Sequence, residues 1–266
     1  MATKDNETIG IERTIIIAGI NGDLGQEFAR SLKDHGRLYG ISRGRKKTSL
    51  DYTHICADLL ISEDVGNAFR QIRPSDNIIY VHLPGKFRFE DVNHPITDKN
   101  RDGIDDEIYD TNVRTFKTVR PVLLNYLETN LDSNLKIVGI GSACDIYDIP
   151  FWKSFTHSKN ELRKEFRLMY GNSETCDRVS SLFINVSTVT GTQLCSERPF
   201  YSREFCLTPS DVVNQSLPYM LDNRHSCLEM SVIKPNPEFM NPNYLCPDEI
   251  RERWYRDMYG HSNIRR

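Results

Sequence analysis

The sequence lacks any long hydrophobic run. One of its longest apolar stretches, residues 15–20, has the length of a β-strand and is too short to cross a bilayer. The first dozen residues are polar and contain no apolar segment of the kind that secretory signals carry. We therefore expect a cytoplasmic protein that makes no contact with a membrane.

Charge and cysteine patterns exclude further classes. The net charge is −3 over 266 residues, with neither the basic excess of a nucleic-acid-binding protein nor an acidic tail. The seven cysteines form no Cys-x-x-Cys pair, and an odd number cannot all be paired, so we expect reduced thiols. No His/Cys cluster has zinc spacing, and the segment 98–103, which begins like a calcium loop, has Tyr109 where a bidentate carboxylate is needed. We expect no metal site.

Short β-branched runs alternate with amphipathic segments along the chain. We expect strands over residues 14–18, 37–41, 54–57, 77–81, 135–140, 181–187 and 228–233. We expect helices over 24–33, 62–72 (capped by Ser62), 108–127, 158–169 and 209–221, with a further short helix after Pro247. This alternation predicts an α/β fold, a doubly wound parallel sheet of the Rossmann type. No linker divides the chain, so we expect one domain over 1–266, with a core of about 14–233 and a proline-rich extension of about 234–266.

Three glycines, Gly19, Gly22 and Gly25, form a turn between the first strand and the first helix. Such a turn needs a residue that tolerates positive φ and lets the backbone approach a phosphate, and its last glycine lets the helix pack close to the strand. The free N–H groups at the helix start then face the anion. The pattern predicts a dinucleotide site, with a plain structural turn as the alternative. The remaining turn residues expected at the cofactor are Asn21, Asp23 and Leu24.

The end of the second strand is strongly basic. Residues 42–47 (SRGRKK) carry four cations and no carboxylate. At this point of the fold an acidic residue would bind the ribose 2′-hydroxyl, whereas arginine accommodates a 2′-phosphate. Ser42, Arg43 and Arg45 therefore favour NADP(H) over NAD(H), with a solvated basic loop as the alternative. Asp58, after the third strand, can accept a hydrogen bond from the adenine amino group or cap the strand end.

Over residues 14–233 the chain resembles the short-chain dehydrogenase/reductase family. The resemblance rests on the glycine turn, on Ala57-Asp58-Leu59, and on Asn112, Ser142 and Lys159 at the family's spacing. It implies NADP(H)-dependent oxidation or reduction of a small molecule. In the family, serine orients the substrate carbonyl, lysine binds the nicotinamide ribose and asparagine holds a water in the proton relay. The resemblance also places Leu59, Leu83, Pro84, Gly85, Val189 and Thr190 at the cofactor.

The chain departs from the family at its general acid. The family's tyrosine lies four residues before the lysine, and here that position is Phe155. A benzyl group donates no proton, and general acid–base assistance is worth about 10²–10⁴-fold. The loop after the fourth strand also departs, since residues 82–85 read His-Leu-Pro-Gly in place of Asn-Asn-Ala-Gly.

Three readings follow from the missing tyrosine. Another acid can replace it, and we rank Asp145 and Tyr147 above His157, which a regular helix would point elsewhere. Alternatively the substrate is unusual: an imine or iminium of specialised biosynthesis, of which the iminium form accepts hydride and gives a neutral amine without a proton, or a bulky carbonyl compound. The third reading is a non-redox cyclase or isomerase, or an inactive cofactor-binding protein. We interpret the chain as an atypical oxidoreductase and keep the third reading as the alternative.

Two further segments carry predictions taken from the family. Phe200, Tyr201 and Phe205 lie after the sixth strand, in a stretch that commonly closes over substrate, and they are expected to form either a hydrophobic lid or a packed interface. The helix expected over 158–169 corresponds to one that often forms a dimer bundle. We therefore expect a homodimer or homotetramer.

Overall fold

The computed structural model describes residues 12–90, 95–143, 150–172, 174–234, 236–237 and 246–260. Seven parallel strands form one sheet in the order β3-β2-β1-β4-β5-β6-β7. The sheet confirms the predicted doubly wound α/β fold, and its order reverses between β1 and β4, where such folds bind ligands. The strands are β1 (Arg13–Ala18), β2 (Arg37–Ser42), β3 (Thr53–Cys56), β4 (Asn77–His82), β5 (Asn134–Ser142), β6 (Val179–Val186) and β7 (Cys227–Val232).

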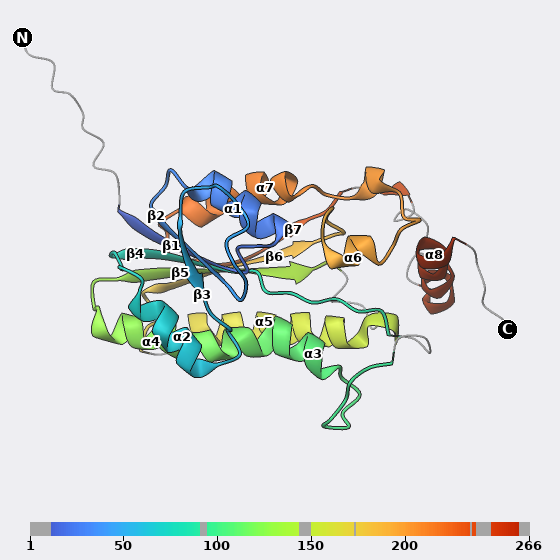
Figure 1. Cartoon of the computed structure of the whole chain (residues 1–266), viewed down its shortest axis with the longest axis horizontal. Helices are drawn as coiled ribbons and strands as arrows, with labels where there is room; N and C mark the ends of the chain where they lie inside the picture. The colour runs from blue at the N-terminus through green and yellow to red at the C-terminus, as the bar shows by residue number, and fades with distance from the viewer. Residues whose placement is uncertain are drawn as a thin grey trace, which may run out of the picture.

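Helices cover both faces of this sheet (Figure 1). One face carries α1 (Asp23–Leu32) and α7 (Pro209–Leu221), and the other carries α2 (Ser62–Arg70), α4 (Thr115–Thr129) and α5 (Lys153–Tyr170). The short helix α3 (Asp106–Tyr109) precedes α4, while α6 (Gln193–Ser196) and α8 (Pro247–Tyr259) lie beyond the carboxyl ends of the strands. Each face therefore has its own hydrophobic core.

The first strand shows why these residues form a central strand. Ile15 and Ile17 are buried against α1 and α7, whereas Ile16 is buried in the core beneath α4 and α5. Because both faces are covered, the strand is a continuous apolar run and does not alternate with polar residues. Burying each such side chain stabilises the fold by roughly 1.5–3 kcal/mol.

Two helices differ from their predicted bounds. The helix expected from residue 158 begins at Lys153, because the Ser154 N–H donates to the Glu90 carboxylate at 2.9 Å and the Ser154 hydroxyl accepts from the Asp105 N–H at 2.8 Å. The helix expected over 108–127 contains a π-helical turn at Asp110–Arg114. These features depend on long-range contacts and on one inserted residue per turn, neither of which apolar periodicity reveals.

The prediction that Ser62 caps α2 is wrong, since Ile61 occupies the cap position and no side chain caps the helix. The apolar residues Leu162, Phe166 and Met169 of α5 are buried in the core and therefore form no outward dimer face. Self-association stays a prediction. Within the described ranges, no helix is both long and apolar enough to traverse a bilayer.

Candidate functional site

The turn between β1 and α1 requires glycine at residues 19 and 25. Gly19 adopts φ +81°, and its N–H donates to the Ile41 carbonyl at 2.9 Å. A Cβ atom on Gly19 would lie 3.1 Å from the backbone of Leu83, and one on Gly25 would lie 2.5 Å from the Gly19 carbonyl oxygen. The turn is therefore a tight backbone cradle at the amino terminus of α1.

A groove of about 410 Å³ lies beside this turn, at the carboxyl ends of β1, β2 and β4. It brings together residues that the sequence placed at the cofactor but that lie far apart in the chain. Its walls include Gly19, Asn21, Gly22, Ser42, Arg43, Lys47, Asp58, Leu59, Leu83, Pro84, Gly85, Thr111 and Thr115.

The residues of the groove fit a dinucleotide. The Asn21 amide nitrogen donates to the Ser42 hydroxyl at 2.8 Å and to the Arg45 carbonyl at 2.9 Å, while its buried Oδ1 has no hydrogen-bond partner in the described part of the chain. A ribose hydroxyl can satisfy such an acceptor. Arg43 and Lys47 supply positive charge along the same wall. One Asp58 oxygen accepts from the Leu60 N–H at 3.0 Å and so caps its own loop.

A smaller pocket of about 150 Å³ continues from the groove, and Leu83 and Gly85 line both. Ser142, at the end of β5, and Phe155 and Lys159, on α5, converge here. Lys159 is only 5% exposed, and its Nζ donates to the Ile140 carbonyl at 3.0 Å and lies 5.6 Å from the centroid of the Phe155 ring. The other walls are mainly apolar: Leu24, Phe87, Ile140, Val186, Val189 and Leu194.

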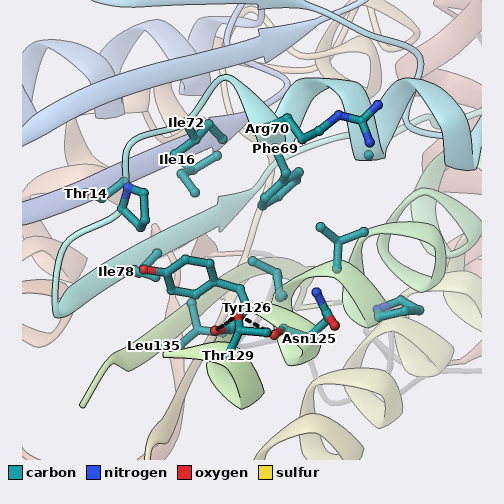
Figure 2. Close-up of a pocket in the computed structure, with 15 residues that line it drawn as sticks. Thr14, Ile16, Phe69, Arg70, Ile72, Ile78, Asn125, Tyr126, Thr129 and Leu135 are labelled. Carbon is teal, nitrogen blue, oxygen red and sulfur yellow. Dashed lines mark hydrogen bonds between the residues drawn. The ribbon is translucent and has the colours of Figure 1, made fainter. Parts of the chain in front are cut away.

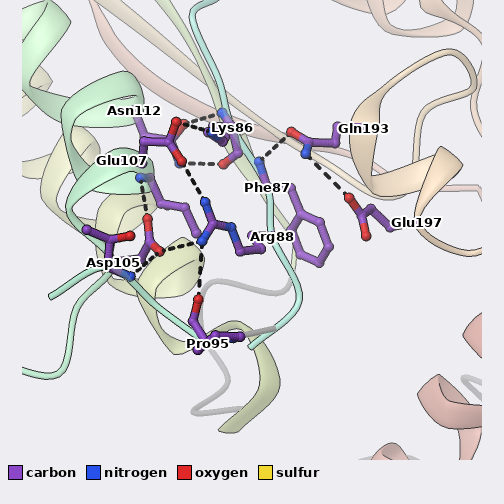
Figure 3. Close-up of polar contacts among 11 residues, drawn as sticks. Lys86, Phe87, Arg88, Pro95, Asp105, Glu107, Asn112, Gln193 and Glu197 are labelled. Atoms are coloured by element: carbon purple, nitrogen blue, oxygen red, sulfur yellow. Dashed lines mark hydrogen bonds and ion pairs between the residues drawn. The ribbon is translucent and has the colours of Figure 1, made fainter. Parts of the chain in front are cut away.

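Asn112 lies in the π-helical turn and is 0% exposed. Its Oδ1 accepts from the Lys86 N–H at 2.6 Å and its Nδ2 donates to the Lys86 carbonyl at 3.0 Å (Figure 3). The same Nδ2 donates to the Ser158 hydroxyl at 2.8 Å. π-Helical turns are frequent at functional sites. Asn112 thus fixes the backbone that leaves the groove wall, and the water-holding role implied by the resemblance stays a prediction.

Phe155 belongs to an aromatic cluster. The edge of its ring meets Phe87 at 5.2 Å and 80°, and Phe87 lies 6.2 Å from Trp254 of α8. The cluster comprises Phe87, Phe89, Ile108, Phe151, Trp152, Phe155, Ile250, Trp254 and Met258. Helix α8 therefore covers the wall of the pocket, a function that the sequence analysis missed. Ile250, Trp254 and Met258 repeat every fourth residue, and this stripe was the available signal.

A buried arginine holds α8 in place. The Arg198 guanidinium lies 3.7 Å from the ring centroid of Tyr201 and 4.0 Å from that of Trp254. It forms an ion pair with Asp257 and donates to the Thr188 hydroxyl at 3.1 Å. The predicted lid residues therefore divide, because Tyr201 packs on this arginine whereas Phe200 is 62% exposed.

Of the remaining predicted residues, those that the structure describes lie outside the linings of the two pockets. Asp145 and Tyr147 fall outside the described residues. His157 is exposed and stacks on Tyr109 at 6.0 Å. Thr190 is not among the described residues that line either pocket, and its N–H donates to the Leu207 carbonyl. Thr192 and Gln193 line the smaller pocket instead. Asp23 packs against Gly191, where a Cβ atom would meet its carboxylate.

Another hollow, of about 430 Å³, lies between α2 and α4 near the amino ends of the strands (Figure 2). Phe69, Tyr126 and Leu135 line it, and no described residue lines both this hollow and the groove. Doubly wound folds bind cofactors at the carboxyl ends of their strands, so this hollow is not the cofactor site.

No family model matches the sequence, and no curated protein is detectably similar to it in sequence. Its fold is shared with solved structures. A short-chain dehydrogenase from Burkholderia cenocepacia in complex with NADP has 14% identity and a TM-score of 0.66, covering 92% of this chain and 99% of that one. An aldohexose dehydrogenase from Thermoplasma acidophilum has 12% identity and a TM-score of 0.66 over 83% of this chain and 92% of that one. A 4-hydroxyisoleucine dehydrogenase complexed with NADH has 19% identity and a TM-score of 0.64 over 83% and 97%. The likeness shows the fold of short-chain dehydrogenases/reductases.

Proposed function

We propose that this chain is an atypical NADP(H)-dependent oxidoreductase of the short-chain dehydrogenase/reductase type, which reduces an imine, an iminium or a bulky carbonyl compound. The observation that carries the proposal is the pocket in which Ser142, Lys159 and Phe155 converge, directly continuous with the groove beside the glycine turn. Bound NADPH would supply the hydride. Two of the similar solved structures are complexes with NADP and with NADH, and they support a nicotinamide cofactor in this groove.

The preference for NADP(H) rests on charge at one end of the groove. Arg43 and Lys47 line it beyond the end of β2, and Asn21 ties the glycine turn to Ser42 and to the Arg45 carbonyl. Guanidinium and ammonium groups bind a phosphate dianion by charge-assisted hydrogen bonds. A 2′-phosphate is thus favoured over a bare 2′-hydroxyl.

The chemistry of the pocket supports the proposal of an unusual substrate. The Ser142 hydroxyl can hydrogen-bond the reacting group, Lys159 lines the same pocket, and apolar walls exclude water. A carbonyl that gains hydride becomes an alkoxide and needs a proton, whereas an iminium becomes a neutral amine. Phe155 donates no proton, and in the described lining only Lys86 and Lys159 carry an ionisable one. The 150 Å³ volume admits the reacting group, while the rest of a bulky substrate must extend out of the pocket.

Titration with NADPH and NADH, followed by the intrinsic fluorescence of the two tryptophans, tests the cofactor. We expect saturable binding, tighter for NADPH. If neither NADPH nor NADH binds, the cofactor assignment is refuted. NADPH consumption is then measured against cyclic imines and ketones of matched size. Tight binding without turnover on any of them would leave a non-redox enzyme or an inactive cofactor-binding protein as the better interpretation.

Restoring the hydroxyl tests the site itself. Phe155→Tyr adds a phenol next to Lys159, and we expect ketone reduction to rise by about 10²-fold or more. Phe151→Tyr is the matched control, because it adds the same hydroxyl within the same aromatic cluster. Equal rates in the two variants would show that Phe155 does not occupy the position of the acid.

A further inference from the structure

His82 is a buried titratable residue that the proposed chemistry does not use. It is the last residue of β4 and immediately precedes the groove-lining loop Leu83–Gly85. Its side chain is 1% exposed and lies between Tyr80 of the same strand and the start of α4. The ring also packs edge-on against Phe116 at 5.2 Å. His82 is not among the described residues that line the groove.

The hydrogen bonds around His82 have one consistent direction. The Thr115 hydroxyl donates its proton to the Thr111 carbonyl at 2.8 Å, so it accepts from His82 Nε2 at 3.2 Å. His82 Nδ1 then accepts from the Tyr80 hydroxyl at 3.0 Å. Burial, and secondarily the charge of Lys159, lowers the pKa of His82 to about 3. The ring is therefore neutral, as this chain of bonds requires.

The loop Leu83–Gly85 is tied to the same helical segment on both sides. Before the loop, the His82 ring bonds to Thr115; after it, the Lys86 backbone bonds twice to the Asn112 amide (Figure 3). The loop and the helical residues Thr111 and Thr115 also both line the groove. The two attachments therefore fix the distance between the loop and these residues.

We propose that His82 is a positioning residue for the cofactor, which together with Asn112 clamps the loop Leu83–Gly85 against the π-helical turn and so sets the groove for the ribose-phosphate portion of a dinucleotide. This inference rests on the proposed cofactor. It assigns His82 no contact with the ligand. His82 acts on the loop through its hydrogen bond to Thr115. The bond from Tyr80 only gives the buried Nδ1 atom of the ring a hydrogen-bond partner.

Three variants and one double variant test the clamp. His82→Phe keeps the ring packing and removes the hydrogen bonds to Tyr80 and to Thr115. Thr115→Val removes the hydroxyl that accepts from His82, with little change of shape. Tyr80→Phe is the matched control, because it removes only the bond between Tyr80 and His82. We expect the NADPH Kd to rise about fivefold in each of the first two variants and to change less than about twofold in Tyr80→Phe. Thr115 also lines the groove, so Thr115→Val could weaken binding by a direct effect on the ligand. The double variant His82→Phe/Thr115→Val distinguishes this direct effect from loss of the clamp. A clamp predicts an effect no larger than that of one single variant, whereas independent contacts predict the product of the two.

Hydrogen exchange of the cofactor-free proteins separates this inference from the proposed function. We expect the amides of Leu83 and of Gly85–Phe87 to exchange faster in His82→Phe and Thr115→Val than in the wild type and in Tyr80→Phe. Unchanged exchange in Thr115→Val, multiplicative affinities in the double variant, or an equal effect of Tyr80→Phe would overturn the clamp. Failure of the wild type to bind NADPH would overturn the proposed function, and with it the clamp's role in cofactor binding, while exchange would still report the loop attachment.

Discussion

The buried imidazole of His82 should make the stability of the fold fall in mild acid. Its pKa is lowered from 6.5 to about 3 in the folded protein, by burial and by the charge of Lys159. Between these values the unfolded chain binds a proton that the folded protein does not, so the free energy of unfolding rises with pH across this window. Above pH 6.5 the contribution is fully present, and it is lost progressively as the pH falls towards 3.

The size of the effect follows from the same two values. Lowering the pH from 7.5 to 5.0 protonates the unfolded histidine almost completely and the folded one hardly at all, which costs about 2 kcal/mol of stability. His82→Phe removes this group, so the difference in unfolding free energy between wild type and variant should shrink by about 2 kcal/mol over that range. The other histidines are present in both proteins, and their contributions cancel in the difference.

Urea unfolding at pH 7.5, 6.0 and 5.0, followed by far-ultraviolet circular dichroism, measures this difference. Thr115→Val is the control, because it keeps the buried imidazole and should therefore retain the wild-type pH dependence. Parallel stability curves for wild type and His82→Phe would refute the reasoning, since they would mean that His82 titrates alike in the folded and unfolded states.

Three further predictions concern the turn, helix α8 and the basic end of the groove. Gly25→Ala places a Cβ atom 2.5 Å from the Gly19 carbonyl oxygen, and it should lower the free energy of unfolding by about 1–3 kcal/mol and the NADPH affinity at least about tenfold. Gly22→Ala is the matched control, because its Cβ atom meets nothing closer than 3.6 Å. Equal losses in the two variants would argue against the backbone cradle. Asp257→Asn leaves the buried Arg198 without its counter-charge and should destabilise the protein by about 3 kcal/mol in thermal or urea unfolding, with a red shift of tryptophan emission as Trp254 is exposed; an unshifted spectrum would show that α8 stays docked without the pair. Arg43→Ala combined with Lys47→Ala should raise the Kd for NADPH about tenfold or more and change the Kd for NADH by less than about twofold. An equal rise of both Kd values would show that these residues do not recognise the 2′-phosphate.

The sheet could be predicted from the sequence because its signals are local. Buried β-branched runs mark the strands, and the observed ends lie within two residues of those expected, as at β4. The start of α5 could not be predicted in this way. It depends on Glu90 and Asp105, whose contacts with Ser154 span more than forty residues of sequence.

The candidate site was predictable in part. The spacing of Ser142 and Lys159 identified two residues that the fold brings into one pocket. The covering of Phe155 by α8 was not predicted, because a stripe such as Ile250, Trp254 and Met258 indicates a packed helix without indicating its partner. The hydrogen bond between His82 and Thr115 was not predicted either. In the sequence, His82 is visible only as a departure from the family's Asn-Asn-Ala-Gly.

Deuterium transfer tests the central claim most directly. The protein is mixed in excess over NADPH deuterated at C4 of the nicotinamide, in separate experiments with the two epimers, together with a cyclic imine, and the product is analysed by mass spectrometry. We predict that one epimer delivers one deuterium to the former imine carbon, and that His82→Phe slows this at limiting NADPH. Saturable NADPH binding with no deuterium in any imine or carbonyl product would contradict the account.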